Sequence, residues 1–365
     1  MGPRALLKDG ASKRIPSLDG LRAISIVMVL LGHLLGTAGL PVQWLPFAWG
    51  ALGVTVFFVI SGYLITGLLL KEKDRAGTIS LKMFYFRRTL RIFPAMYVFL
   101  AVVVALGAMG ILAGANEQVR VQLSHADVLA AATYTMNFRA DHTWWLGHTW
   151  SLAVEEQFYL LWPAAVAYLG VAGGLRISVG AMLAAPLFRV TLYYFWPAQR
   201  PLVDQGFPFV FDALATGCVL AILRQRLWDN DRYRAILESP WFVLVPLIVV
   251  ASHTLVPSVG LSLLAGRTVV NVGVAMCVDW SIRFHESPIG RLLNSWPLVW
   301  VGVVSYSLYL WQQLFLCRYH TRWFTTFPVN IGLAFAAATV SYHLVEKPIL
   351  RLRERLEKKM RSATV

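Results

Sequence analysis

Two ionisable residues, Arg22 and His33, lie within the apolar stretch SLDGLRAISIVMVLLGHLL at residues 17–35. They are eleven residues apart, close to three helical turns, so both project from one helix face about 16 Å apart along the axis. Ionisable residues in a membrane segment are costly and usually face a bundle interior or a wet cavity. Histidine also exchanges protons readily near pH 7. The spacing leaves two interpretations open: a proton-handling site, or a neutral His33 hydrogen-bonded to a neighbouring helix.

A cluster of arginines follows in FRRTLRIFP at residues 86–94. Arg87 and Arg91 are four residues apart and share a helix face, with Arg88 beside them. Guanidinium groups bind phosphate oxygens in a fork, so the cluster is a candidate phosphate receptor. Arginines at a cytoplasmic helix start also act as plain topology signals, and composition alone does not separate the two interpretations.

The stretch GHTWSLAVEEQFYLLWP at residues 147–163 contains His148, Glu155 and Glu156. Glu155 lies about one turn inside the predicted helix and is followed by aromatic residues. A carboxylate there needs a partner, such as a substrate hydroxyl, an arginine or a histidine. The alternative is a carboxylate that the dipole stabilises near a helix start.

Four further residues are expected to support these groups. Asp19 precedes Arg22 by three residues and is expected to cap the first helix and orient Arg22. Ser61 lies in VISGYL, which lacks the G-x-S-x-G pattern of a nucleophile elbow. Tyr306 and Tyr309 in VSYSLYLWQQ are expected to be interfacial anchors.

The remaining polar and sulfur-bearing residues are expected to have structural roles. Arg189 and Asp212 stand in apolar surroundings and are expected to pair, since charges inside membranes usually do. Cys218, Cys277 and Cys317 fall in apolar segments without paired spacing, which indicates small packing residues. The histidines show no metal-ligand spacing, so no metal is expected.

Long apolar segments must position these residues. The 365-residue chain is 57% hydrophobic and 14% charged, with a mean hydropathy of +0.59, whereas a soluble domain is about a quarter charged. A membrane span needs roughly 20 mostly apolar residues. The predicted fold class is all-α, a single polytopic transmembrane helix bundle. Ten spans are predicted, at residues 22–40, 48–70, 92–113, 150–171, 177–196, 207–223, 240–257, 262–281, 298–317 and 326–346.

The net charge of +14 is distributed unevenly between the two sides of this bundle. One side receives 26 of the 33 Lys and Arg residues, and the positive-inside rule assigns it to the cytoplasm with both termini. The predicted organisation is a cytoplasmic basic segment at 1–21, a transmembrane domain at 22–348 and a cytoplasmic basic tail at 349–365. No cleavable signal peptide is expected. The charge serves topology and contact with anionic lipid, so nucleic acid is not an expected partner.

Several stretches together resemble the acyltransferase-3 family of integral membrane acyltransferases. They run in family order from residue 17 to 348 and are LDGLR with His33 downstream, GVTVFFVISGYLIT, FRRTLRIFP, HTWSLAVEEQFYLLWP, SYSLYLW and VEKP. The resemblance implies a multi-pass protein of the bacterial cytoplasmic (inner) membrane. It also implies transfer of an acyl group, often acetyl, from cytoplasmic acyl-CoA to a hydroxyl of a carbohydrate or small molecule. The sequence departs from the family at Gln312, where members often have histidine, and at Phe211, where many have arginine.

The resemblance also implies a donor site. It identifies Arg22 and His33 as an R-x10-H signature, and it implies that Arg87, Arg88 and Arg91 contact CoA together with Arg22. Acetyl-CoA or another acyl-CoA is the expected donor co-substrate, bound at the cytoplasmic mouth with its pantetheine arm entering between helices.

The expected reaction places His33 at the reactive end of this donor. His33 takes a proton from the acceptor hydroxyl as that oxygen attacks the thioester carbonyl, and Glu155 is the second expected catalytic residue. The acceptor is expected to arrive from the outer side, past His148, Glu155 and Glu156. A covalent acyl-His33 intermediate is the rival mechanism.

Other classes of function remain open from the sequence. A proton-coupled transporter or flippase for a glycan or small metabolite also uses mid-membrane His and Arg, although no inverted repeat is evident. A structural partner of a polysaccharide-export complex is a third alternative. The acceptor, the length of the acyl chain, and the choice between monomer and homodimer are not determined by the sequence.

Overall fold

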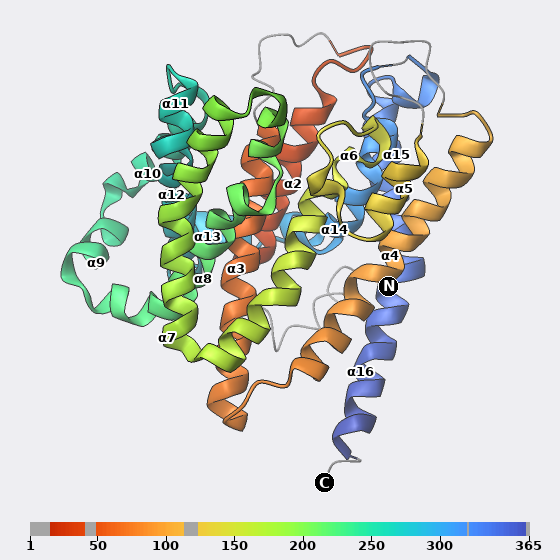
Figure 1. The fold of residues 1–365 in the computed structure, drawn as a ribbon. Helices are drawn as coiled ribbons and strands as arrows, with labels where there is room; N and C mark the ends of the chain where they lie inside the picture. The colour runs from red at the N-terminus through yellow and green to blue at the C-terminus, as the bar shows by residue number, and fades with distance from the viewer. Residues whose placement is uncertain (1–14, 41–48, 113–122, 320, 363–365) are drawn as a thin grey trace.

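The computed structural model describes residues 15–40, 49–112, 123–319 and 321–362, and within these ranges every regular element is a helix (Figure 1). The outer parts of the two predicted basic tails, residues 1–14 and 363–365, lie outside the described residues. The all-α fold class is therefore confirmed for the described chain.

The helices follow one another with short connections. The α-helices are α2 (Leu18–Leu34), α3 (Trp49–Ala76), α4 (Leu81–Ala108), α5 (His125–Ala132), α6 (Trp144–Gly147), α7 (Thr149–Phe195), α8 (Phe207–Asp229), α9 (Asp231–Glu238), α10 (Leu244–Thr254), α11 (Val259–Leu261), α12 (Arg267–Arg283), α13 (Pro288–Leu293), α14 (Trp296–Phe315), α15 (Val329–Ser341) and α16 (Lys347–Ser362). The 3-10 helices are η1 (Met136–Phe138), η2 (Pro197–Asp204), η3 (Pro240–Val243) and η5 (Trp323–Thr325), and the π-helical turns are η4 (Ser262–Gly266) and η6 (Tyr342–Glu346).

Each of the ten predicted spans overlaps a helix, and two of them fall on the two legs of α7. The legs meet at Gly170, whose φ of 70° and ψ of 179° belong to a region that only glycine adopts readily. By length and composition, five helices of the described chain can cross a membrane, or six if the bent pair Asp231–Glu238 and Pro240–Thr254 is one span. The protein is an integral membrane protein, and the count of ten spans stays a prediction.

The bundle has two distinct ends, seen in Figure 1. One end, called the α16 end, carries α16, the connection between α3 and α4, and the bend of α7. The opposite end, called the α6 end, carries α5, α6 and η2. The basic segments 71–91 and 347–362 lie at the α16 end, the predicted cytoplasmic side.

The centre of the bundle is formed by α2, which packs against both α3 and α14. Glycine allows this close approach, because a Cβ at Gly302 of α14 would overlap the backbone carbonyl of Asp19 in α2. On the other side of α3, a Cβ at Gly62 would overlap the carbonyl of Leu214 in α8. These contacts set the positions of Arg22 on α2 and Ser61 on α3.

The expected pair of Arg189 and Asp212 is confirmed. The Arg189 Nη1 group donates to Asp212 Oδ2 at 2.9 Å, and both side chains are buried. Arg189 also donates to the carbonyl oxygens of Phe209 and Leu263, so it ties α7 to α8 and to the π-helical turn η4. The three cysteines form no disulfide among the described residues, and Cys218 and Cys317 are buried, in agreement with the predicted packing role.

The contact between α2 and α14 leads to a prediction for Gly302→Ala. The added methyl group must separate the two backbones, and such overpacking costs about 1–3 kcal/mol of folding free energy. We expect a lower thermal unfolding midpoint in detergent than for the wild type. The control is Gly332→Ala in α15, where a Cβ meets no heavy atom within 4 Å and the midpoint should be unchanged or higher. Equal midpoints for Gly302→Ala and the wild type would contradict the packing argument.

Candidate active site

A cavity of about 440 Å³ lies among α2, α3, α4, α7, α14 and the segment that joins α15 to α16. Its cationic lining residues are Arg22, Lys71, Arg88 and Arg91. Its acidic lining residues are Asp19, Glu155, Glu156 and Glu346. The tertiary structure therefore gathers charged side chains from segments that are far apart in the sequence.

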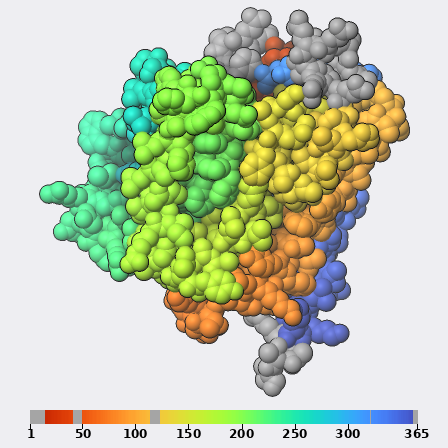
Figure 2. Space-filling view, viewed as in Figure 1, coloured from red at the N-terminus to blue at the C-terminus, as the bar shows by residue number. Residues whose placement is uncertain are grey.

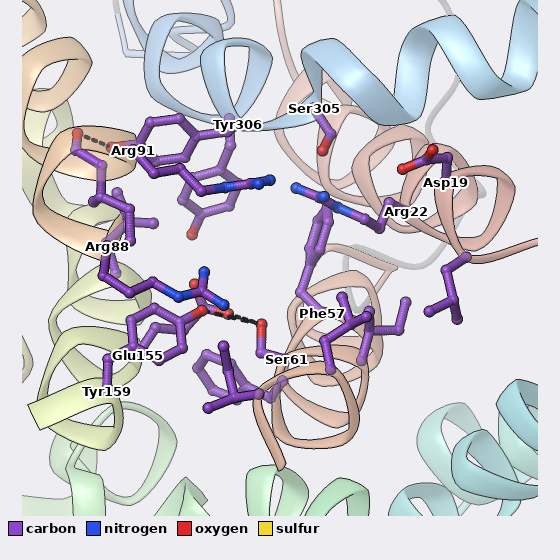
Figure 3. Close-up of a pocket in the computed structure, with 18 of the residues that line it drawn as sticks. Asp19, Arg22, Phe57, Ser61, Arg88, Arg91, Glu155, Tyr159, Ser305 and Tyr306 are labelled. Carbon is purple, nitrogen blue, oxygen red and sulfur yellow. Dashed lines mark hydrogen bonds between the residues drawn. The ribbon is translucent and has the colours of Figure 1, made fainter. Parts of the chain in front are cut away.

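Three arginines converge on this cavity (Figure 3). Arg22 and Arg91 point toward each other from opposite walls, and Arg88 extends toward Ser61 and Glu155. None of the three guanidinium groups lies within 4.0 Å of a carboxylate oxygen among the described residues. Like charges in a low-dielectric interior repel one another, and a phosphate between them removes that repulsion. Three convergent guanidinium groups of this kind can hold phosphate oxygens.

Glu155 is held at the wall of the cavity by a hydroxyl group. Ser61 Oγ donates to Glu155 Oε1 at 2.5 Å, and the Tyr159 hydroxyl donates to Ser61 Oγ at 3.3 Å. The Arg88 guanidinium carbon lies 4.6 Å from the centre of the Tyr159 ring, a cation–π distance. Ser61 thus orients Glu155, and Tyr159 orients both Ser61 and Arg88.

The other carboxylates have separate surroundings. Glu156 Oε1 is buried without a hydrogen-bond partner among the described residues. Glu156 was expected on the outer approach of the acceptor, but it lines the same cavity as the three arginines. Ser307 donates to Glu346, which the π-helical turn η6 directs into the cavity. Asp19 was expected as a helix cap, and this is corrected: Ser17 is the N-cap residue of α2, and Asp19 lies inside the first turn.

An aromatic layer closes the cavity toward the α6 end. Phe57 and Tyr309 pack edge to face with ring centres 6.5 Å apart, and both line the cavity. The Tyr309 hydroxyl donates to the carbonyl oxygen of His148 at 3.0 Å and lies 2.5 Å from Ser151 Oγ. Tyr306 also lines the cavity, and its hydroxyl donates to the Ile92 carbonyl at 2.8 Å. Both tyrosines are interior residues, so the expected role as interfacial anchors is corrected.

His33 lies beyond this layer and does not line the cavity. It is the penultimate residue of α2, at the α6 end, and its Nδ1 lies 2.9 Å from Gln312 Oε1. An amide oxygen only accepts, so Nδ1 carries the proton and Nε2 keeps a free lone pair. The His33 ring meets Trp144 edge to face at 5.5 Å. The departure from the family at Gln312 therefore falls on the direct partner of His33.

His148 is buried near the same layer. Its Nε2 donates to the Leu310 carbonyl at 3.1 Å, and its ring contacts Phe99 and Tyr309. The Nδ1 atom has no hydrogen-bond partner among the described residues. His148 thus connects the aromatic layer to α14 and does not line the arginine cavity.

Arg87 is separated from the other arginines of its cluster. Its Nη2 donates to Glu72 Oε2 at 3.0 Å, which joins the start of α4 to the end of α3. Arg87 does not line the cavity, whereas Arg88 and Arg91 do. Among the described residues, no group of three or more His, Cys, Asp or Glu side chains is placed to hold a metal ion.

Comparison with known proteins shows the family of the chain. The sequence profile described as an acyltransferase domain, Acyl_transf_3, matches residues 15–344. The chain belongs to the acyltransferase-3 family. No solved structure is significantly similar to it.

Several curated relatives of this acyltransferase carry related names. The peptidoglycan O-acetyltransferase OatA of Listeria monocytogenes is 28% identical over 383 residues, covering 92% of this chain and 56% of the relative. The O-acetyltransferase OatA of Staphylococcus aureus (strain NCTC 8325 / PS 47) is 28% identical over 380 residues, covering 95% of this chain and 59% of the relative. The chain thus spans less than three fifths of the length of these relatives.

Sequence reasoning missed some residues of the site. Glu346 lies at the end of a predicted span, and the rule that intramembrane charges are functional would have indicated it. Tyr159 offered no such signal, because aromatic side chains are common in membrane helices. Gln312 stood out as a departure from the family, but nothing in the sequence indicated its contact with His33. Their positions follow from the packing of helices that are remote in the chain.

The convergence of arginines predicts a measurable effect of Arg91→Gln. Hydrogen bonds to charged groups contribute about 1.5–3 kcal/mol, so we expect coenzyme A to bind about 10–100-fold more weakly. Isothermal titration calorimetry in detergent measures this. The control is Arg75→Gln, which removes an exposed arginine at the end of α3 and should leave the affinity unchanged. Equal loss in both variants would show that the effect is general electrostatics.

Proposed function

We propose that the protein is a membrane O-acyltransferase that moves an acyl group, expected to be acetyl, from acyl-CoA to a hydroxyl of a carbohydrate or small-molecule acceptor. The observation that carries this proposal is the set of three arginines that face a cavity with no carboxylate oxygen within 4.0 Å in the described part of the chain. Membership of the acyltransferase-3 family and relatives named O-acetyltransferase support the same reaction class.

The donor is proposed to enter from the α16 end. Its phosphates bind Arg22, Arg88 and Arg91, whose planar guanidinium groups match phosphate oxygens. Arg22 and His33 are eleven residues apart on one helix, about 16 Å along the axis. The pantetheine arm therefore has to bridge this distance if the thioester is to meet His33.

The aromatic layer lies across this route. Phe57 and Tyr309 close the cavity, so the arm reaches His33 only when at least one ring moves. The hydrogen bonds of Tyr309 to His148 and Ser151 favour the closed position. A closed layer also keeps water and ions from passing between the two ends while no donor is bound.

The proposed reaction uses the free Nε2 lone pair of His33. The acceptor hydroxyl oxygen attacks the thioester carbonyl carbon while His33 Nε2 takes its proton. The carbon–sulfur bond then breaks, and the leaving CoA thiolate recovers the proton from the imidazolium. Gln312 keeps the ring in the required tautomer through its contact with Nδ1.

The acceptor is proposed to approach from the α6 end, where His33, Trp144 and His148 lie. Relatives named for peptidoglycan O-acetylation make a cell-surface carbohydrate the first acceptor to test. The proposed location is the bacterial cytoplasmic membrane, with the α16 end and both termini in the cytoplasm. A monomer and a homodimer both fit this proposal.

The proposed function predicts acetyl-CoA-dependent release of CoA by the purified full-length protein when a hydroxyl acceptor is present. His33→Ala should lower kcat by about 10²–10⁴-fold, the usual contribution of a general base. A thiol-reactive dye follows the release, and calorimetry checks that acetyl-CoA still binds. Wild-type activity in His33→Ala would overturn the role of His33. Proton flux in vesicles without any CoA release would instead favour a transporter.

The contact with His33 predicts that Gln312 orients the His33 ring, and Gln312→Met tests this role. Methionine fills a similar volume but cannot hold the Nδ1 proton, so we expect kcat to fall about tenfold or more. The KM for acetyl-CoA should stay within about twofold, because the arginine cavity is untouched. A matched variant, Gln313→Met, changes the neighbouring amide, which forms no hydrogen bond with His33 among the described residues, and should have a smaller effect on kcat. Equal losses of kcat in the two variants would contradict the proposed orientation of His33.

A further inference from the structure

The C-terminal helix α16 is part of the mouth of the arginine cavity. It continues from η6, packs against α4, and contributes Leu350 to the cavity wall. Figure 2 shows α16, in blue, beside α4, in orange, at the lower right of the molecule. The segment predicted as a basic tail at 349–365 therefore includes a helix with a packed inner face.

Arg353 lies on this inner face, one turn beyond Leu350. Its side chain is 21% exposed and its Nε lies 3.3 Å from Glu357 Oε1, whose side chain is 18% exposed. The Nε atom has no hydrogen-bond partner with good geometry among the described residues. Arg353 is also within electrostatic reach of Arg87 and Arg91 on α4. A guanidinium group is thus placed between the cavity and the surface.

We propose that Arg353 binds the 3′-phosphate of the donor's nucleotide, an inference that rests on the proposed acyl-CoA-dependent function. Coenzyme A carries two phosphate positions, a diphosphate and a 3′-phosphate, separated by one ribose. When Arg22, Arg88 and Arg91 hold the diphosphate in the cavity, the 3′-phosphate lies toward the mouth. Arg353 lies one helical turn beyond the cavity-lining Leu350, on a helix that packs against α4.

The pair with Glu357 leaves Arg353 able to take this ligand. A guanidinium group has five N–H donors, and one carboxylate uses two at most. An ion pair that is partly exposed contributes little to stability, so a phosphate dianion can share or replace it. Glu357 then serves to hold the arginine in place when no donor is bound.

Anionic lipid is a weaker candidate for Arg353. The outward face of α16 presents four exposed basic side chains, Arg351, Arg355, Lys358 and Lys359, which suit contact with lipid headgroups. Arg353 instead is largely covered, on a helix that packs against α4 and contributes Leu350 to the cavity wall. The inward position favours a ligand that is also held by the cavity.

Binding of the proposed donor and of an analogue without the 3′-phosphate tests the proposal. Acetyl-CoA and acetyl-3′-dephospho-CoA are titrated into the full-length protein in detergent. The wild type should bind acetyl-CoA at least about tenfold more tightly than acetyl-3′-dephospho-CoA, because only acetyl-CoA has the 3′-phosphate that accepts a charged hydrogen bond. Arg353→Gln should lose about that factor for acetyl-CoA while its affinity for the dephospho analogue stays within about twofold. The affinity of Arg353→Lys for acetyl-CoA should lie between those of the wild type and Arg353→Gln, because lysine keeps the charge but cannot form the two parallel hydrogen bonds of a guanidinium group.

The control variant is Arg355→Gln, two residues along the helix on the exposed face, which should not change either affinity. Equal loss for both ligands in Arg353→Gln would show a structural role of α16 and overturn the proposal. An unchanged affinity for acetyl-CoA would overturn it as well. If the wild type binds neither ligand, the proposed acyl-CoA-dependent function is itself contradicted. If the wild type binds both equally, only the 3′-phosphate site is wrong.

Discussion

The structure depends on three guanidinium groups, of Arg22, Arg88 and Arg91, that face one cavity with no carboxylate oxygen within 4.0 Å among the described residues. Arg22 and Arg88 are partly buried, and Arg91 is exposed. Burying such charges is costly unless they are neutralised. Glu155 and Glu346 line the same cavity, and each is held by a serine, through Ser61 and Ser307. The carboxylates therefore offset the positive charge at longer range and leave the donors of the arginines free. This compromise makes the cavity both stable when empty and receptive to phosphate.

Close backbone packing places these charges with precision. The start of α2 lies directly on α14 at Gly302, and the middle of α3 lies on α8 at Gly62. A helix that cannot slide or separate presents its side chains at one fixed height. Arg22, just inside the start of α2, and Ser61, beside Gly62, are held in this way. The pair of Arg189 and Asp212 fastens the second leg of α7 from outside the cavity.

His33 does not line the arginine cavity. Phe57 and Tyr309 both line it, and the Tyr309 hydroxyl donates to the carbonyl oxygen of His148, whose ring contacts Tyr309. In the proposed function, the donor and the acceptor arrive from opposite sides, and this aromatic layer would keep water away from the thioester.

The sequence by itself determined the helical segments, because hydrophobic period is a local property. It also indicated the pairing of Arg189 with Asp212, because charges in apolar segments usually pair. It could not separate Arg87 from Arg88, because both stand at one helix start and only the nearby Glu72 directs Arg87 away from the cavity. The contact of His33 with Gln312, the aromatic barrier and the packed face of α16 were decided by tertiary structure alone. They join segments hundreds of residues apart, and no local pattern records which helix becomes which neighbour.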